Sequence, residues 1–168
     1  MPPFGNFTVK AQEPVRRAHE LAIERGQNQV DALHLLTALI LQEEGIVGTV
    51  LEKMDVDPDE LLKTVMASID AKNRSGVLEA RGQMFLSAEF GKVLEMSFKI
   101  AQLMKDDYIS TEHMFLALFD VASRAKNILA SSRIERSHAE RVLEEVRGAG
   151  HVTDLEPETK MKVLERYG

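Results

Sequence analysis

The chain repeats itself, and this internal repeat constrains the fold more than any other feature of the sequence. Residues 30–39 (VDALHLLTAL) and 109–118 (ISTEHMFLAL) share a histidine and most apolar positions, and His34 and His113 lie 79 positions apart. The same offset aligns residues 8–56 with the second half once a single residue is deleted. A unit that recurs at a fixed period is one supersecondary structure used twice. The sequence therefore predicts two copies of one bundle.

Apolar residues recur at helical spacing in both copies, which predicts an all-α fold of about eight helices in two pseudo-twofold four-helix repeats. Asp31, Ser87 and Ser110 are suitable N-caps. Residues 57–60 (DPDE) combine a cap with a proline at the first helical position, which marks the start of the fourth helix. Pro14 falls within the first expected helix; because an interior proline removes a backbone donor, we expect that helix to begin near Pro14 or to kink there. The apolar positions of the fourth helix are Leu61, Leu62, Val65 and Ile69.

These signals divide the chain into five segments. We expect a tail at 1–7, the first repeat at 8–72, a loop at 73–86, the second repeat at 87–147 and a linker at 148–168. The loop contains two glycines among mixed charges, and a Gly-Ala-Gly run ends the second repeat. The polar tail after that run predicts a linker that leads to a module beyond this sequence.

Composition excludes several classes of protein. Cysteine is absent, so the chain has no disulfide scaffold, thiolate metal site or cysteine nucleophile. The net charge is −6 and is spread along the chain, which disfavours a nucleic-acid partner. No apolar run approaches the length of a membrane span, and residues 1–8 lack the order of a signal peptide. We expect a cytoplasmic protein with no membrane partner.

The sequence offers little catalytic chemistry. It contains no phosphate-binding Gly-rich loop and no Gly-x-Ser-x-Gly motif. Only one Glu-x-x-His spacing occurs, at Glu135 and His138, whereas a di-iron bundle needs two. His34 and His113 each fall in the first turn of an expected helix, and we predict that their ring nitrogens satisfy nearby backbone groups. A catalytic role would need a partner and a pocket that the sequence does not show.

Two features, a helix start and a group of methionines, are compatible with ligand binding, and each has two interpretations. Residues 110–112 (STE) open a helix, whose first amides carry partial positive charge. Glu112 is suited either to pair with a guanidinium or ammonium group of a bound peptide or to complement its own helix dipole. Methionine is adaptable and suits a surface that accepts many apolar sequences, but methionines at helical spacing are also typical of a core. The methionines in question are Met84, Met96, Met104 and Met114.

The repeated blocks carry a resemblance to a known family. Together with residues 106–113 (DDYISTEH), Phe7-Thr8 and residues 85–87 (FLS), they resemble the double repeat of the Clp ATPase N-terminal domains. The resemblance covers about residues 7–148. The tail at 152–168 is similar to the linker of the ClpB-type disaggregases, which favours that branch of the family.

This resemblance implies a function in protein handling. Such domains sit above a hexameric motor and bind exposed apolar segments of unfolded or aggregated proteins, and in some cases an adaptor protein. The domain itself is then not an enzyme and needs no cofactor or metal; ATP and magnesium belong to the ATPase modules of the full-length protein. The isolated domain is expected to be a monomer and the full-length protein a homohexamer.

The resemblance also implies a substrate groove. Its apolar part includes Leu94 and Met96, and its other positions are Thr8, Asp106, Glu112 and His113. The ClpC/ClpA-type branch offers an alternative, adaptor docking or recognition of phosphorylated arginine through a glutamate in each repeat. Here the second repeat has Glu112 but the first has Leu33, so a symmetric pair of such sites is not expected.

Overall fold

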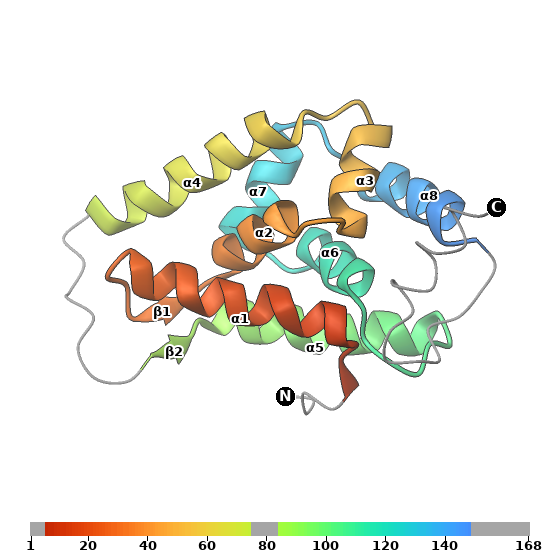
Figure 1. The fold of residues 1–168 in the computed structure, drawn as a ribbon, viewed down its shortest axis with the longest axis horizontal. Helices are drawn as coiled ribbons and strands as arrows, with labels where there is room; N and C mark the ends of the chain where they lie inside the picture. The colour runs from red at the N-terminus through yellow and green to blue at the C-terminus, as the bar shows by residue number, and fades with distance from the viewer. Residues whose placement is uncertain (1–5, 75–83, 149–168) are drawn as a thin grey trace.

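The computed structural model describes residues 6–74 and 84–148, which form eight helices and two very short strands (Figure 1). The helices of the first repeat are α1 (Val9–Glu24), α2 (Ala32–Leu41), α3 (Ile46–Lys53) and α4 (Pro58–Arg74). Those of the second repeat are α5 (Ala88–Leu103), α6 (Thr111–Asp120), α7 (Arg124–Ser131) and α8 (Arg136–Arg147). The strands are β1 (Gln29–Val30) and β2 (Phe85–Leu86).

The helix starts follow the offset found in the sequence. α5 and α6 begin 79 positions after α1 and α2, while α7 and α8 begin 78 positions after α3 and α4. The one-residue deletion therefore falls in the connection between the second and third helices of the repeat. The predicted all-α fold with two four-helix repeats is confirmed.

The two repeats exchange backbone hydrogen bonds reciprocally. β1 pairs in parallel with β2, and the bridge between Phe7 and Ile109 is the counterpart of the Leu86–Val30 pair. The amide of Ser87 donates to the carbonyl of Val30 at 2.9 Å, and the amide of Thr8, 79 positions earlier, donates to the carbonyl of Ile109, also at 2.9 Å. Each repeat thus supplies a backbone hydrogen-bond acceptor for the segment that leads into the first helix of the other repeat. Two-residue strands have no periodicity that sequence patterns can detect, so these pairings were not predicted.

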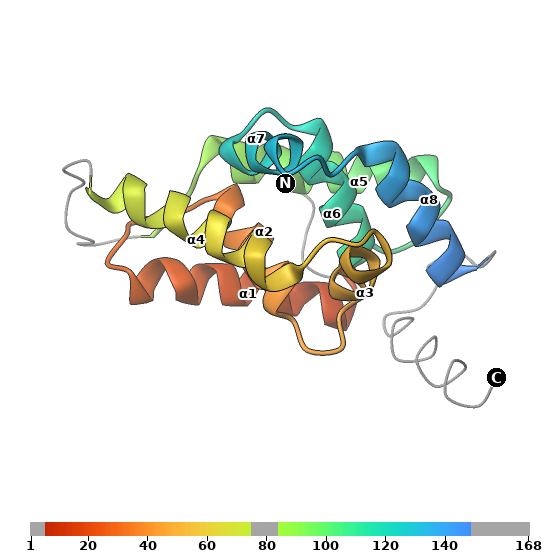
Figure 2. The ribbon, with the colours of Figure 1, turned by 90° about the horizontal axis from the view of Figure 1, so that it is seen from above.

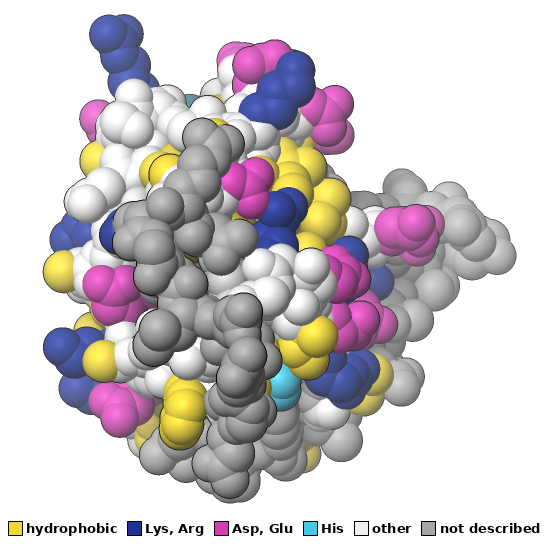
Figure 3. Space-filling model, turned by 90° about the vertical axis from the view of Figure 1, so that its left-hand side faces the viewer, with side chains coloured by type: hydrophobic (Ala, Val, Ile, Leu, Met, Phe, Trp, Pro, Cys, Tyr) yellow, Lys and Arg dark blue, Asp and Glu magenta, His cyan; other side chains and the backbone are white. Residues whose placement is uncertain are grey.

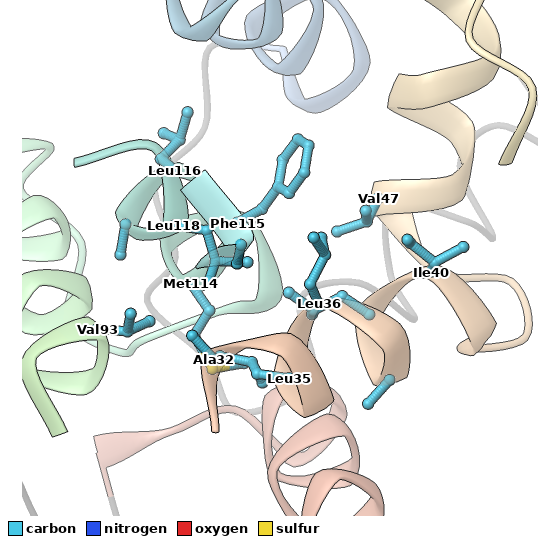
Figure 4. Packing of buried hydrophobic residues seen from close by; sticks show 14 of the residues in the cluster. Ala32, Leu35, Leu36, Ile40, Val47, Val93, Met114, Phe115, Leu116 and Leu118 are labelled. Carbon is cyan, nitrogen blue, oxygen red and sulfur yellow. The ribbon is translucent and has the colours of Figure 1, made fainter. Parts of the chain in front are cut away.

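The core lies around α2 and α6. Figure 2 shows α1 along one side and α5 and α7 along the other, with α2 and α6 between them. All but the last residue of α2 is buried, and the same holds for α6. Leu36 of α2 and Phe115 of α6 lie at the centre of the close-up in Figure 4, and the rings of Phe115 and Phe119 form an edge-to-face contact at 5.2 Å. The helices of the two repeats also cross-pack, since α3 contacts α8 and α4 contacts α7.

α1 accommodates Pro14 without ending. The helix begins at Val9, capped by Thr8, so the first of the two expected alternatives, a start near Pro14, is wrong. Proline has no N–H to donate to the carbonyl of Lys10. The side-chain amide of Gln42 donates to that carbonyl at 2.8 Å and to Glu13 at 2.9 Å. A side chain from the connection after α2 therefore supplies the missing donor.

Other predicted boundaries agree closely with the structure. Asp31, Ser87 and Ser110 cap α2, α5 and α6 as expected. The amide of Asp59 donates to the Asp57 side chain at 3.0 Å, at the start of α4. The expected loop at 73–86 is shorter than predicted at both ends, because α4 reaches Arg74 and β2 occupies Phe85–Leu86. The rest of that loop, the tail at 1–5 and the expected linker from 149 onward lie outside the described residues.

Candidate functional site

Two histidines close the first turns of the central helices in the same way. The backbone N–H of Asp31 donates to Nδ1 of His34 at 2.9 Å, and that of Ser110 donates to Nδ1 of His113 at 2.8 Å. Because Nδ1 accepts in both rings, the proton lies on Nε2, which is free to donate. The prediction that these ring nitrogens satisfy nearby backbone groups is confirmed.

The histidines differ in the partner of Nε2. In the first repeat His34 donates to the amide oxygen of Gln27 at 2.6 Å. In the second repeat His113 donates to the carboxylate of Asp106 at 2.7 Å. Gln27 and Asp106 occupy equivalent positions, 79 residues apart. The partner of the histidine is thus a neutral amide in the first repeat and a carboxylate in the second.

Asp106 belongs to a larger ionic cluster at the start of α6. Arg147, the last residue of α8, donates to Asp106 at 2.5 Å and lies 3.3 Å from an oxygen of Glu112. The side chains of Arg147, Asp106 and Glu112 are only 7%, 0% and 2% exposed. Ser110 donates to Glu112 at 3.1 Å, which fixes the orientation of that carboxylate. We call Asp106, Glu112, His113 and Arg147 the ionic cluster.

The ionic cluster keeps its arginine charged. Burial alone would lower the pKa of Arg147, but the hydrogen bond from Arg147 to Asp106 and the negative charges of Glu112 and Asp106 outweigh that effect. The net result is a raised pKa for Arg147. The guanidinium is therefore a permanent cation that balances part of the buried negative charge.

The first repeat has no counterpart of this cluster. Leu33 stands at the position of Glu112, and Ile69 stands at the position of Arg147 once the deletion is counted. Both are buried, at 0% and 1% exposure. The Gln27 side chain donates to the backbone carbonyl of Ile69 at 3.3 Å. The same location is therefore neutral in one repeat and ionic in the other.

The other predicted groove residues have different surroundings. Thr8 is fully buried and its hydroxyl accepts from the amide of Ala11 as the cap of α1. Leu94 is 4% exposed and belongs to the core, whereas Met96 is partly buried and packs against the core. The structure thus brings Asp106, Glu112 and His113 together and leaves Met96 as the predicted apolar position with surface access. The substrate-binding role of the six residues stays a prediction.

Sequence reasoning missed the fourth member of the ionic cluster. Glu112 does meet a guanidinium group, as one of its two interpretations required, but the group belongs to Arg147 of the same chain. The available signal was the repeat itself. Extending the alignment to Ile69, a predicted apolar position, places Arg147 opposite it. A charged residue at a core position of the repeat indicates a buried partner.

Several large apolar side chains are exposed, and they come from different elements of the fold. On the face shown in Figure 3, small groups of hydrophobic atoms are separated by charged and polar side chains. Within the described part of the chain, Leu103 is the most exposed large hydrophobic residue, at 83%. The exposed large hydrophobic residues are Val9, Ile23, Leu41, Phe85, Leu86, Phe98 and Leu103.

A hollow of about 500 Å³ lies between α1 and the end of α2. Pro14 and Leu41 contribute apolar surface, but acidic and basic side chains of α1 and of the connection after α2 line most of it. Among residues 6–74 and 84–148, no three His, Asp or Glu side chains are grouped so as to hold a metal ion. No single described helix is long and apolar enough to cross a membrane; α2 and α3 meet that criterion only as a pair bent by 82°.

Comparison with known proteins assigns the family. The model of the Clp repeat (R) N-terminal domain matches residues 6–146, and the chain therefore belongs to the Clp N-terminal domain family. The chaperone protein ClpB of Nitratidesulfovibrio vulgaris is 33% identical over 168 residues, which cover 98% of this chain and 19% of the relative. The ClpB of Rhodopirellula baltica is 32% identical over 166 residues, 98% of this chain and 18% of the relative. The chain thus spans about a fifth of the length of these relatives.

Solved structures share the fold. The N-terminal domain of Hsp104 from Candida albicans superimposes with a TM-score of 0.76 at 22% identity, covering 91% of this chain and 99% of that one. At that identity the likeness concerns the fold alone. It confirms that the paired four-helix architecture is the one used by the N-terminal domains of Clp-type chaperones.

Proposed function

We propose that this domain recognises client proteins for an ATP-dependent Clp chaperone. It binds exposed apolar segments of unfolded or aggregated proteins for delivery to a hexameric motor, and it carries out no reaction of its own. Membership of the family and the relatives called chaperone protein ClpB support this proposal. The chain spans only 19% of the first of these relatives. On this proposal the motor and its ATP belong to modules that this sequence does not include.

The observation that carries the proposal is an apolar edge on α5 that α1 lacks. Met96 and Leu103 lie seven positions apart, so they share one side of the helix. Leu103 is 83% exposed, and Met96 is partly buried. The equivalent positions on α1 are Arg17 and Glu24, which form an ion pair at 2.9 Å. At these two equivalent positions the second repeat thus has apolar side chains where the first repeat has an ion pair.

The surroundings of this edge suit weak and general binding. Met96 is flexible and adapts to side chains of different shape. Lys92 and Lys99 are exposed on the same helix and keep the edge soluble between clients. Several copies of a weak site around a ring raise the effective concentration of binding sites, so each domain can release its client readily.

The test removes the two apolar side chains of this edge. Met96→Ser with Leu103→Ser should weaken binding to a permanently unfolded model protein by roughly thirtyfold, because each side chain contributes about 1 kcal/mol of apolar contact. Leu41→Ser, at an exposed apolar position of the first repeat, is the matched control and should bind as the wild type does. Leu94→Ser is unsuitable because Leu94 is in the core. Equal affinities for the double variant and the wild type would exclude the α5 edge as the binding surface.

A further inference from the structure

The segments that lead into the first helix of each repeat carry an outward-facing carbonyl at equivalent residues, Phe7 and Leu86. The register pairs Leu86 with Val30, and the amide of the next residue, Ser87, donates to the carbonyl of Val30 at 2.9 Å. Because successive residues of a strand direct their backbone groups to alternate sides, the amide and the carbonyl of Leu86 point away from β1. The bridge between Phe7 and Ile109 leaves the carbonyl of Phe7 pointing outward in the same way.

A side chain closes this outer edge in the first repeat and none closes it in the second. Nε2 of Gln12 donates to the carbonyl of Phe7 at 3.2 Å, and Phe7 is only 2% exposed. The position equivalent to Gln12 is Gly91, 79 residues later, which has no side chain to donate. Among the described residues nothing hydrogen-bonds to the amide or the carbonyl of Leu86. The outer edge of β2 is therefore open.

The open edge is apolar on both sides of the strand. Phe85 and Leu86 are 53% and 43% exposed, and consecutive strand residues point to opposite faces. β2 lies at the rim of the ribbon in Figure 1 and pairs with β1 on its inner side. A Cβ atom at Gly91 would meet no atom within 4 Å, so there is room where the first repeat has the side chain of Gln12. Glycine is a poor helix former, and here it stands in the first turn of α5, beside an unpaired strand edge.

We propose that the outer edge of β2 docks an extended apolar segment of a client polypeptide, which adds to β2 as a further strand. The unpaired amide and carbonyl of Leu86 match the carbonyl and amide of an extended backbone, and such an edge is a template for strand addition. Phe85 and Leu86 then contact apolar side chains of the segment on its two faces. The inference rests on the proposed function, because the occupant is the same class of client, but it uses other residues than Met96 and Leu103.

The first test changes the backbone of the ligand and keeps its side chains. The probes are an apolar peptide of about six residues, the usual length of a strand, and a twin whose backbone amides are N-methylated. Wild-type protein should bind the unmodified peptide roughly tenfold more tightly, because strand addition needs the backbone donors that methylation removes. Equal affinities for the two peptides, or no binding of either, would overturn the inference.

The second test closes the edge of β2 as the first repeat closes its own. Gly91→Gln places a donor where Gln12 has one, and it should weaken binding of the unmodified peptide roughly tenfold. Gly91→Ala is the matched control and should bind as the wild type does. Alanine and glutamine are both better helix formers than glycine, so neither variant should melt below the wild type, and a loss of binding cannot reflect unfolding. Equal affinities of the two variants would overturn the inference.

Two further outcomes separate the inference from other accounts. If Gly91→Gln leaves the affinity for the unfolded model protein unchanged while Met96→Ser with Leu103→Ser lowers it, the proposed function stands and the inference fails. A dimer of the wild type that forms with rising concentration in sedimentation, and that Gly91→Gln abolishes, would assign the edge to a second copy of the chain and likewise overturn the inference.

Discussion

The two repeats place a histidine at the same point of the same framework but surround it with different chemistry. Around His34 the neighbours are Gln27, Leu33 and Ile69, and the group is neutral. Around His113 the equivalent neighbours are Asp106, Glu112 and Arg147, and the group is ionic. The helical framework is therefore compatible with either the neutral or the ionic set of side chains. The difference teaches that the three positions differ between the repeats as a set, because a buried charge is tolerated only when its partners are present.

The comparison is tested most strongly by removing the arginine. Arg147→Ala leaves two buried carboxylates without their cation and should lower the free energy of unfolding by about 3–5 kcal/mol. The control is Arg25→Ala, which breaks the ion pair with Asp70 in the first repeat; those side chains are 23% and 41% exposed. That change should cost less than about 1 kcal/mol. Urea unfolding of both variants gives the two values.

The arginine contribution should also be constant across ordinary pH. A group whose folded pKa is raised stabilises fully below its unfolded pKa and loses that contribution only as the pH rises through the folded value. For Arg147 this window lies above the ordinary arginine pKa. Repeating the urea measurement at neutral and mildly alkaline pH should give the same difference between wild type and Arg147→Ala.

Removing each histidine should give unequal losses. His34→Ala leaves a backbone amide and the neutral Gln27 side chain without their partner. His113→Ala leaves a backbone amide and the carboxylate of Asp106. Because an unsatisfied charged group costs more than a neutral one, His113→Ala should be the more destabilising by about 1–2 kcal/mol. Equal losses in thermal and urea unfolding would mean that Arg147 alone compensates Asp106.

The compensation for Pro14 within α1 can be tested with two substitutions. Gln42→Ala should cost about 1 kcal/mol because the carbonyl of Lys10 loses its donor. In a Pro14→Ala background the new backbone N–H supplies that donor, so Gln42→Ala should cost much less. A double-mutant cycle measures the coupling. Additive effects would show that Gln42 does not compensate for the proline.

The smallest expected effect lies at the end of the first helix of each repeat. Gly26 and Lys105 occupy equivalent positions with φ of 68° and 61°. A left-handed conformation favours glycine over a residue with a Cβ atom. Lys105→Gly should therefore stabilise the domain by up to about 1 kcal/mol, and Gly26→Ala should destabilise it by a similar amount. A Cβ at Gly26 would meet no atom within 4 Å, so the loss would report backbone conformation alone. Melting temperatures that move in the opposite directions would refute this assignment.

Most of the fold was predictable because its signals are local. Asp31, Ser87 and Ser110 mark helix starts through hydrogen bonds within the following turn, and the spacing of the repeat assigns the second bundle from the first. The parallel pairing of β1 with β2 was not predictable, because two residues carry no pattern. For the same reason, the end of the loop at β2 was not predictable.

The candidate site was only partly predictable because its contacts join distant positions. Glu112 was recognised from its place in a helix start, but its contact with Arg147 depends on how α8 packs. Leu94 was expected in a groove, yet its side of α5 faces the core. Helical spacing gives the buried side of an amphipathic helix but not how much of its edge a neighbouring helix covers. Leu103 shows the same limit, since its helical spacing does not predict that it is 83% exposed.

The most direct test of the account converts one centre into the other. Replacing Asp106→Gln, Glu112→Leu and Arg147→Ile together gives the second repeat the neutral set found in the first. Replacing a whole set of buried ionic groups by residues that pack well often leaves the stability unchanged or raises it. Removing one member of the set lowers the stability by several kcal/mol. We predict that urea unfolding of the triple variant gives a free energy equal to or above that of the wild type, although each single change lowers it. A triple variant as unstable as the sum of its single changes would contradict the equivalence of the two centres.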